Sequence, residues 1–380
     1  MLLCYLWRPP ALHNIAKSDS AMATNRIAFV TTLLLIVFGV VSAIRPPLQV
    51  RSETSRSSAK RNAAIRWAVT AFGSKPRGIF ESPEYAARAK QRDFCLSGQA
   101  PFMDTATNFV RYPVAFQNLS FSVFCYAQQD LVSNQILRAG SWEEDTSKNM
   151  LDTMQQACDK LDITKDKAVF LDIGANIGWF SLLFAAAGHS VIAFEPMKSN
   201  EQLLRRSLCS NAGFQQRVAY YTDMLSDAEH ENCTLFSGID NLGDGTVTCD
   251  QQFIAPENYT VQDSGLQMTS VDIVLATLDR PVLMVKMDVE GYEGHVFQGA
   301  VKTIIQARVP FIVFEFSYAW VKQSGRHPDM LIERLSEAGY QFSFDSFQGA
   351  PFDPVVYFAD PEVEQADLTN IFCVHESMLL

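Results

Sequence analysis

Acidic side chains follow two apolar runs in the middle of the chain, and a glycine-rich turn lies between them. Residues 169–171 are apolar and lead into Asp172, after which residues 174–178 read Gly-Ala-Asn-Ile-Gly. Glycines let a ligand approach the backbone, and the free N–H groups of a following helix attract a carboxylate or phosphate. The second apolar run, residues 190–194, leads into Glu195, whose carboxylate can accept both hydroxyls of a ribose. These residue types and spacings predict a site for a nucleoside-like cofactor.

The acid before the turn narrows the kind of cofactor. The turn has the spacing G-x-x-x-G, so the G-x-G-x-x-G fingerprint of dinucleotide sites is absent. Asp172 would repel a pyrophosphate, but it suits an ammonium group such as the amino-acid end of S-adenosylmethionine. Glu195 lies 23 positions after Asp172, close to the spacing of about 20 residues for a ribose-binding acid. The alternative interpretation is a tight strand–helix turn with exposed acids.

A second pair of carboxylates follows a third apolar run. Residues 282–287 are apolar apart from Lys286, and Asp288 and Glu290 come directly after them. Strand alternation places these two carboxylates on one side, and a carboxylate can remove a proton from a hydroxyl group. We predict that Asp288 or Glu290 orients and deprotonates an acceptor, with Lys286 and Glu293 shaping the site. The alternative is a structural ion-pair network that holds the strand to the next helix.

Other polar residues near these motifs receive weaker predictions. His295 is predicted to lie on a helix surface rather than to act as a base. Trp142 and Glu143 are predicted to close over the cofactor, with simple packing as the alternative. No CxxC pair is present and no His/Cys cluster has metal-ligand spacing, so no metal site is predicted. Cys233 and Cys249 flank a Gly/Asp-rich turn, and either a hairpin disulfide or free thiols fit that spacing.

The elements that must position these residues alternate between strands and helices. Polar residues 228–269 interrupt the alternation and predict a hairpin-like insertion. This order predicts a doubly wound α/β fold. The predicted strands are 169–171, 190–194, 218–225, 282–287, 311–316, 340–347 and 371–375; the predicted helices are 147–161, 179–187, 199–213, 271–278, 293–307 and 328–339.

Three motifs carry a family resemblance: DIGANIGWFS, AFEP and KMDVEGYEGHVFQGA. Together with DLVSNQI, GSWE, LSD and FIVFEFS, they resemble the FkbM-type family of class I S-adenosylmethionine-dependent methyltransferases over roughly residues 112–375. The resemblance implies a Rossmann-like, mostly parallel sheet of seven strands with helices on both faces, and methyl transfer to hydroxyls of sugars or other small molecules. Tyr292, where a small residue is usual, and the long insertion depart from the family pattern. By position, the implied cofactor-binding residues are Asp172, Gly174, Asn176, Gly178 and Glu195, with Asp227 near the adenine.

The N-terminal part of the chain has a different character. Residues 27–44 are eighteen residues without a charge, bracketed by Arg26 and Arg45, and a helix of that length spans about 27 Å. We predict an uncleaved signal-anchor that crosses the membrane once, with a cleaved signal peptide or a buried helix as alternatives. The predicted organisation is a tail (1–26), the span (27–44), a stem and linker (45–111) and a methyltransferase-like domain (112–380).

The orientation of this predicted anchor has conflicting signals. Five basic residues follow the span and three precede it, a bias that would keep the domain in the cytosol. The sequons at Asn118, Asn232 and Asn258 would be glycosylated only in the lumen. We predict a single-pass membrane protein of the secretory pathway, with secretion after cleavage or organelle targeting as alternatives.

Charge limits the possible partners. The chain carries a formal net charge of −11, although residues 1–66 hold nine Lys/Arg and only two acids. An acidic domain disfavours nucleic acid, because binding phosphates requires Lys/Arg surfaces. We therefore predict an S-adenosyl-L-methionine-dependent methyltransferase, most simply an O-methyltransferase acting on a glycan or small molecule. The rival predictions are a non-catalytic protein of the same fold that acts in trafficking or binding, and a nicotinamide oxidoreductase.

Overall fold

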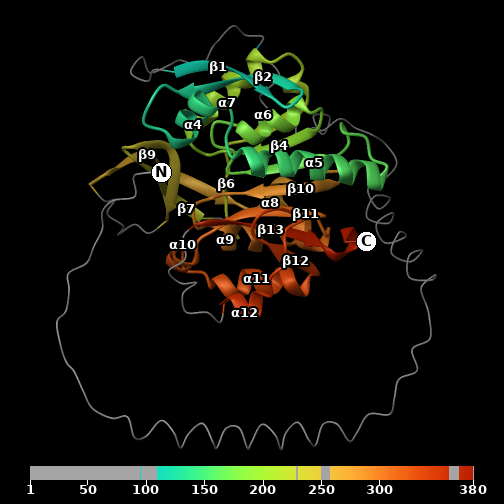
Figure 1. Cartoon of the computed structure of the whole chain (residues 1–380). Coiled ribbons are helices and arrows are strands. Elements are labelled where there is room, and N and C mark those ends of the chain that lie inside the picture. The colour runs from blue at the N-terminus through green and yellow to red at the C-terminus, as the bar shows by residue number, and fades with distance from the viewer. Residues whose placement is uncertain (1–94, 96–108, 228–229, 250–256, 359–367, 380) are drawn as a thin grey trace, which may run out of the picture. The chain divides into compact units, whose positions relative to one another are not determined.

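The computed structural model describes residue 95 and residues 109–227, 230–249, 257–358 and 368–379 (Figure 1). The predicted membrane segment, its tail and the stem lie outside these residues. Within the described residues, no helix has both the length and the apolar character needed to cross a membrane.

A seven-stranded sheet forms the centre of the domain, as the sequence predicts. Its strand order is β12-β13-β11-β10-β3-β4-β5, and only β13 runs antiparallel to its neighbours. The chain adds strands first to one side of β3 and then, after β5, to the other, so the order reverses between β3 and β10. The strands are β3 (Val169–Ile173), β4 (Ser190–Phe194), β5 (Val218–Tyr221), β10 (Val282–Met287), β11 (Phe311–Phe316), β12 (Tyr340–Ser343) and β13 (Thr369–His375).

Helices cover both faces of this sheet (Figure 1). Alternate residues of β3 reach opposite cores: Phe170 packs with the first group of helices, whereas Leu171 packs with the second group. The first group is α4 (Leu131–Ala139), α5 (Glu144–Leu161), α6 (Trp179–Ala186) and α7 (Lys198–Ser210), and the second is α8 (Val271–Val274), α9 (Glu293–Gln298), α10 (Tyr318–Gln323), α11 (Pro328–Glu337) and α12 (Pro354–Phe358). Both faces of the central strands are therefore buried, which explains why their sequences are continuously apolar.

Three predicted elements differ in detail. The predicted strand 218–225 divides, because β6 (Met224–Leu225) leaves the central sheet and pairs with β9 (Tyr259–Thr269). The predicted helix 293–307 is α9 followed by a separate π-helical turn, Val301–Gln306. Gly299 lies at that break, where a Cβ atom would be 2.0 Å from the carbonyl oxygen of Ser226. Close backbone packing thus interrupts the helix.

The insertion forms a second sheet of four strands, with the order β6-β9-β7-β8. Strands β7 (His230–Gly238) and β8 (Asn241–Thr248) make the predicted hairpin, and β9 pairs with the other edge of β7. A disulfide joins Cys233 to Cys249 across the hairpin, which decides between the two alternatives left by the sequence.

Two features lie upstream of the sheet. The alternating residues 119–126 predicted a strand, now β2 (Leu119–Tyr126), whereas its pairing with β1 (Phe109–Phe116) and the second disulfide were not predicted. A second disulfide joins Cys95 to Cys209 of α7. The hairpin of β1 and β2 packs against α6 and α7, where Phe121 contacts Trp179 with ring centroids 5.8 Å apart.

Candidate active site

A cavity of about 710 Å³, including its open mouth, lies at the C-terminal ends of β3, β4 and β10. This is the edge of the sheet where the strand order reverses, the usual ligand position in open α/β sheets. The apolar part of its wall includes Met197, Met224, Leu225, Leu235, Val247 and Met268, and the polar part includes Asn176, Glu195, Asn200, Asp244, Asp288 and Glu290.

The glycine turn lies under this cavity, but protein packing explains its glycines. A Cβ on Gly174 would lie 1.7 Å from the carbonyl oxygen of Asp288, and one on Gly178 would lie 2.4 Å from Leu204. Both glycines have positive φ, and Asn176 adopts the same left-handed region at φ 53°. The sequence predicted that the glycines admit a ligand; in the structure they admit the backbone that follows β10 and the Leu204 side chain of α7. Gly174 and Asn176 still line the cavity, and Gly178 does not.

Asp172 is buried beneath the turn rather than exposed in the cavity wall. Its Oδ2 accepts a hydrogen bond of 2.6 Å from Ser181, and its Oδ1 has no hydrogen-bond partner among the described residues. Burial raises the pKa of this carboxyl, and the nearby Lys286 opposes that rise. Asp172 therefore links β3 to α6, and its predicted contact with an ammonium group stays a prediction.

Glu195 does reach the cavity, at the tip of β4. Its Oε2 accepts a hydrogen bond of 2.7 Å from the backbone of Asn176, and its Oε1 accepts one of 2.9 Å from the backbone of Met197. Burial raises the pKa of Glu195 to about 7, although these backbone hydrogen bonds act in the opposite direction. Each oxygen keeps a further lone pair for a hydroxyl donor.

Asp227 lies away from the cavity lining, contrary to the position implied by the resemblance. It forms an ion pair with Arg326, and its Oδ1 lies 3.2 Å from Nδ1 of His295. Burial favours a higher pKa, but the hydrogen bonds from His295 and Arg326 outweigh it and lower the pKa of Asp227 to about 2. His295, predicted to lie on the helix surface, is instead part of this cluster, with Tyr292 stacked on its ring. Asp223 lines the cavity on this side.

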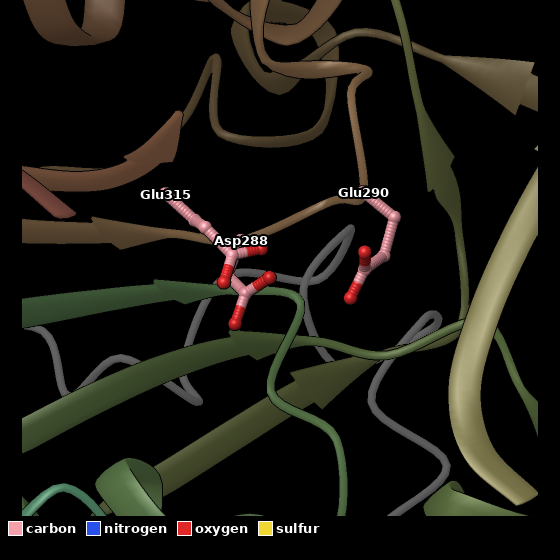
Figure 2. Close-up of side chains that lie close together, drawn as sticks. All are labelled: Asp288, Glu290 and Glu315. Atoms are coloured by element: carbon pink, nitrogen blue, oxygen red, sulfur yellow. The ribbon is translucent and has the colours of Figure 1, made fainter. Parts of the chain in front are cut away.

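The carboxylates at the ends of β10 and β11 form a cluster (Figure 2). Oxygen atoms of Asp288, Glu290 and Glu315 lie within 4.8 Å of one another. Lys286 Nζ lies 2.9 Å from Oδ2 of Asp288 and 3.2 Å from the carbonyl oxygen of Gly174, so the ion pair considered from the sequence is present. Oxygen sets of this kind also suit hard divalent cations, whereas the sequence predicted no metal site.

Glu315 was not among the predicted site residues. It belongs to β11, and Met287 pairs with Phe314 in the parallel register, so Asp288 and Glu315 follow side by side. An acid at the end of the next apolar strand was the available signal, but its use requires knowing that β10 and β11 are neighbours.

The charges within the cluster differ sharply. Burial and the neighbouring Asp288 raise the pKa of Glu290 to about 12 and that of Glu315 to about 10, so both hold a proton at neutral pH. Burial lowers the pKa of Lys286, but Asp288 and Asp172 outweigh it and raise the pKa above its ordinary value. The cluster therefore offers an ammonium-bound carboxylate at Asp288 and two hydroxyl donors beside it.

A second, more open hollow adjoins Glu315. It is lined by Glu143, Glu144, Asp145 and Asn370 among others, and Asn370 donates a hydrogen bond of 3.2 Å to Glu143. Trp142, predicted with Glu143 to close over the cofactor, packs against the apolar core. Glu143 thus faces the Glu315 side of the cluster rather than the cavity at β3 and β4.

The seven-stranded sheet with a cavity at its reversal point is an α/β fold similar to that of S-adenosylmethionine-dependent methyltransferases. Residues 172–342 match the methyltransferase FkbM domain.

Solved structures give distant matches. Methyltransferase FkbM from Methylobacillus flagellatus KT is 19% identical over 55% of this chain and 44% of its own, with a TM-score of 0.33. The chain thus spans less than half of that protein. An S-adenosylmethionine-dependent methyltransferase from Agrobacterium tumefaciens is 11% identical over 73% of both chains, with a TM-score of 0.35. No match is found among curated protein sequences.

Proposed function

We propose that this protein is an S-adenosylmethionine-dependent methyltransferase that methylates a hydroxyl group of a glycan or another small molecule. The observation that carries the proposal is the cavity at the ends of β3, β4 and β10, with Glu195 in its wall, within the segment that matches the methyltransferase FkbM domain. When bound, the cofactor supplies an electrophilic methyl group.

The cavity residues fit the parts of that cofactor. The carboxylate of Glu195 is held by two backbone N–H groups and retains lone pairs for the two ribose hydroxyls. Met197, Leu225 and Met268 provide an apolar surface for a purine ring. Asp172 supports the turn from below through Ser181.

The carboxylate cluster is the proposed acceptor side. Glu290 and Glu315 hold protons and can donate hydrogen bonds to oxygens of a polyhydroxyl acceptor. Asp288 is held by Lys286 and can accept the proton that the acceptor hydroxyl loses. The same residues therefore orient the acceptor and take up its proton.

Equilibrium binding tests the cofactor part of this proposal. The full chain is expected to bind S-adenosylhomocysteine in calorimetry, and Glu195→Ala to lose that binding while remaining folded. A chain that binds NADH and not S-adenosylhomocysteine would overturn the assignment. Mass spectrometry of glycan and small-molecule extracts, incubated with the full chain and deuteromethyl-labelled cofactor, then identifies the acceptor.

The compartment is also a proposal: the domain faces the lumen of the secretory pathway, anchored by residues 27–44. Two disulfides, Cys95–Cys209 and Cys233–Cys249, support an oxidising compartment. Asn118 and Asn258, each in a sequon, are exposed. A mobility shift after glycosidase treatment of the expressed chain, lost in Asn118→Gln and Asn258→Gln, is the expected result. An unshifted chain with reduced cysteines would contradict it.

A further inference from the structure

The start of β8 next to the turn of the β7–β8 hairpin, residues 241–244 (the hairpin tip), is fastened to the cofactor turn. The carbonyl oxygen of Gly243 accepts a hydrogen bond of 3.1 Å from the side chain of Asn176 and one of 2.9 Å from the side chain of Asn200. Asn176 belongs to the glycine turn and Asn200 to α7, so one backbone carbonyl of the insertion connects to both elements that flank the cavity.

A second attachment holds the tip from the opposite side. The N–H group of Gly243 donates a hydrogen bond of 3.1 Å to Oδ1 of Asp130, a fully buried side chain whose Oδ2 accepts from the backbone of Ser133. The N–H group of Leu242 donates to the carbonyl of Gln129 at 2.7 Å. The tip is thus gripped on both sides.

The space at the tip admits only glycine. A Cβ on Gly243 would lie 2.2 Å from Oδ1 of Asp130 and 3.2 Å from Oδ1 of Asn176. A side chain there would push the tip off at least one of its two partners.

The hairpin also supplies part of the cavity wall. Leu235 of β7 and Asp244, Gly245 and Val247 of β8 line the cavity opposite the sheet. A ligand in the cavity therefore lies between strand ends of the central sheet on one side and the inserted hairpin on the other.

The disulfide secures the end of the hairpin away from its tip. In the described part of the second sheet, β8 is an edge strand that pairs only with β7. Cys233 is fully buried beside Met224 and Met268, and its bond to Cys249 fixes the far end of β8 to that small core. Tip and disulfide together hold both ends of the strand that carries Val247.

We propose that the β7–β8 hairpin is the roof of the cofactor site, that Asp130 and Asn200 are positioning residues for it, and that the Cys233–Cys249 disulfide keeps it closed. The inference rests on the proposed function, because the ligand under the roof is the methyl donor. Opening the disulfide frees one end of β8, and the cofactor then has to order the roof as it binds. Affinity falls because binding bears that ordering cost.

The test compares the two disulfides of one chain. Calorimetry measures the affinity for S-adenosylhomocysteine of three proteins: the unaltered full chain, the Cys233→Ser/Cys249→Ser variant and the Cys95→Ser/Cys209→Ser variant. The first variant is expected to bind about tenfold more weakly, and the second within about twofold of the unaltered chain. Limited proteolysis supplies a second readout. S-adenosylhomocysteine should protect the hairpin of the unaltered chain from cleavage, and it should protect the hairpin of the Cys233→Ser/Cys249→Ser variant less.

Each outcome decides between the two proposals. If the unaltered chain binds no S-adenosylhomocysteine, the proposed function and this inference both fail. If it binds and the Cys233→Ser/Cys249→Ser variant binds equally well, only the inference fails. If the Cys233→Ser/Cys249→Ser variant does not fold, Gly243→Ala replaces it in the test, because that variant keeps the Cys233–Cys249 disulfide. Unchanged affinity for S-adenosylhomocysteine in a folded Gly243→Ala variant would overturn the proposal of a roof. A loss of affinity in Gly243→Ala, with a smaller loss in Asp130→Asn, would support it.

Discussion

The cavity has two sides of different origin. Its floor consists of strand ends and the turns that follow them, and each floor residue lies within a few positions of a buried strand of the central sheet. Its roof is an inserted hairpin whose tip is held by Asp130, 113 positions away along the chain. The floor depends on backbone packing within the sheet, whereas the roof depends on a few polar contacts and a disulfide. A change in the backbone packing of the floor should therefore affect folding, whereas a change in the contacts that hold the roof should affect ligand affinity.

The largest effect is expected from Gly174→Ala in the floor. Its Cβ would lie 1.7 Å from the Asp288 carbonyl oxygen, at a φ of +77°. A backbone clash of this kind should cost at least about 4 kcal/mol of unfolding free energy, measured by urea unfolding. Gly265→Ala is the matched control, because it has φ +67° and open space around it, and it should cost about 1 kcal/mol. Equal losses in both variants would contradict the packing explanation.

Asp288→Asn should separate chemistry from binding within the floor. The amide keeps the shape of the side chain but cannot take a proton, so turnover should fall about 100- to 1,000-fold. Affinity for S-adenosylhomocysteine should stay within about twofold, since Asp288 is assigned to the acceptor. Full turnover in this variant would remove Asp288 from the proposed proton transfer.

Glu195 should couple the floor to pH. Its pKa in the folded protein is about 7 against an ordinary value of 4.5, so the folded state binds this proton more tightly than the unfolded state. The stability from this group is complete below pH 4.5 and is lost as pH rises through about 7, by about 3 kcal/mol. Urea unfolding between pH 4.5 and 8 measures this loss as the difference between the unaltered chain and Glu195→Gln, because the raised pKa values of Glu290, Glu293 and Glu315 add a dependence of the same sign to both proteins.

Cofactor affinity should depend on pH in the opposite direction, through the same residue, Glu195. Ribose hydroxyls donate to the ionised carboxylate, so affinity for S-adenosylhomocysteine should rise from pH 6 to 8 by up to about tenfold. A Glu195→Gln variant in which the rise persists would assign it to another group.

The smallest effect is expected outside both sides of the cavity. Arg326→Gln removes the ion pair with Asp227, which lies off the cavity lining. The unfolding free energy should drop by about 1 kcal/mol, because the pair is partly exposed. Affinity for S-adenosylhomocysteine should not change in calorimetry. A tenfold loss of affinity in Arg326→Gln would instead support the position near the adenine that the family resemblance implied for Asp227.

The contrast between floor and roof also explains what could be predicted from the sequence. Residues 190–194, 282–287 and 311–316 were predicted as strands with the observed bounds, because buried parallel strands are short apolar runs ending at polar residues. Gly174, Asn176 and Glu195 were placed correctly at the cavity for the same reason. The direction in which a side chain points was harder to predict. Asp172 and Glu195 both lie at strand ends, but only Glu195 lines the cavity.

The remaining site residues depend on contacts between distant segments. Glu315 joins Asp288 only through the pairing of β10 with β11, and Gly243 meets Asn176 only when the insertion folds back over the sheet. Asp227 lies off the cavity lining, where Arg326, 99 positions later in the chain, binds it. Glu315 carries a local signal as an acid near the end of an apolar run, but none of these residues has a local signal for which distant segment it will meet.

The Cys95–Cys209 disulfide has a mechanical consequence. It joins the chain to α7 before β1 begins, so tension from the N-terminal side of Cys95 passes through a covalent bond into α7 and bypasses the β1–β2 pair. The same helix carries Leu204, which packs behind Gly178 of the cofactor turn, and Asn200, which holds the hairpin tip. A pulling force on the N-terminal side would thus reach the cofactor cavity before it could peel away the first strand.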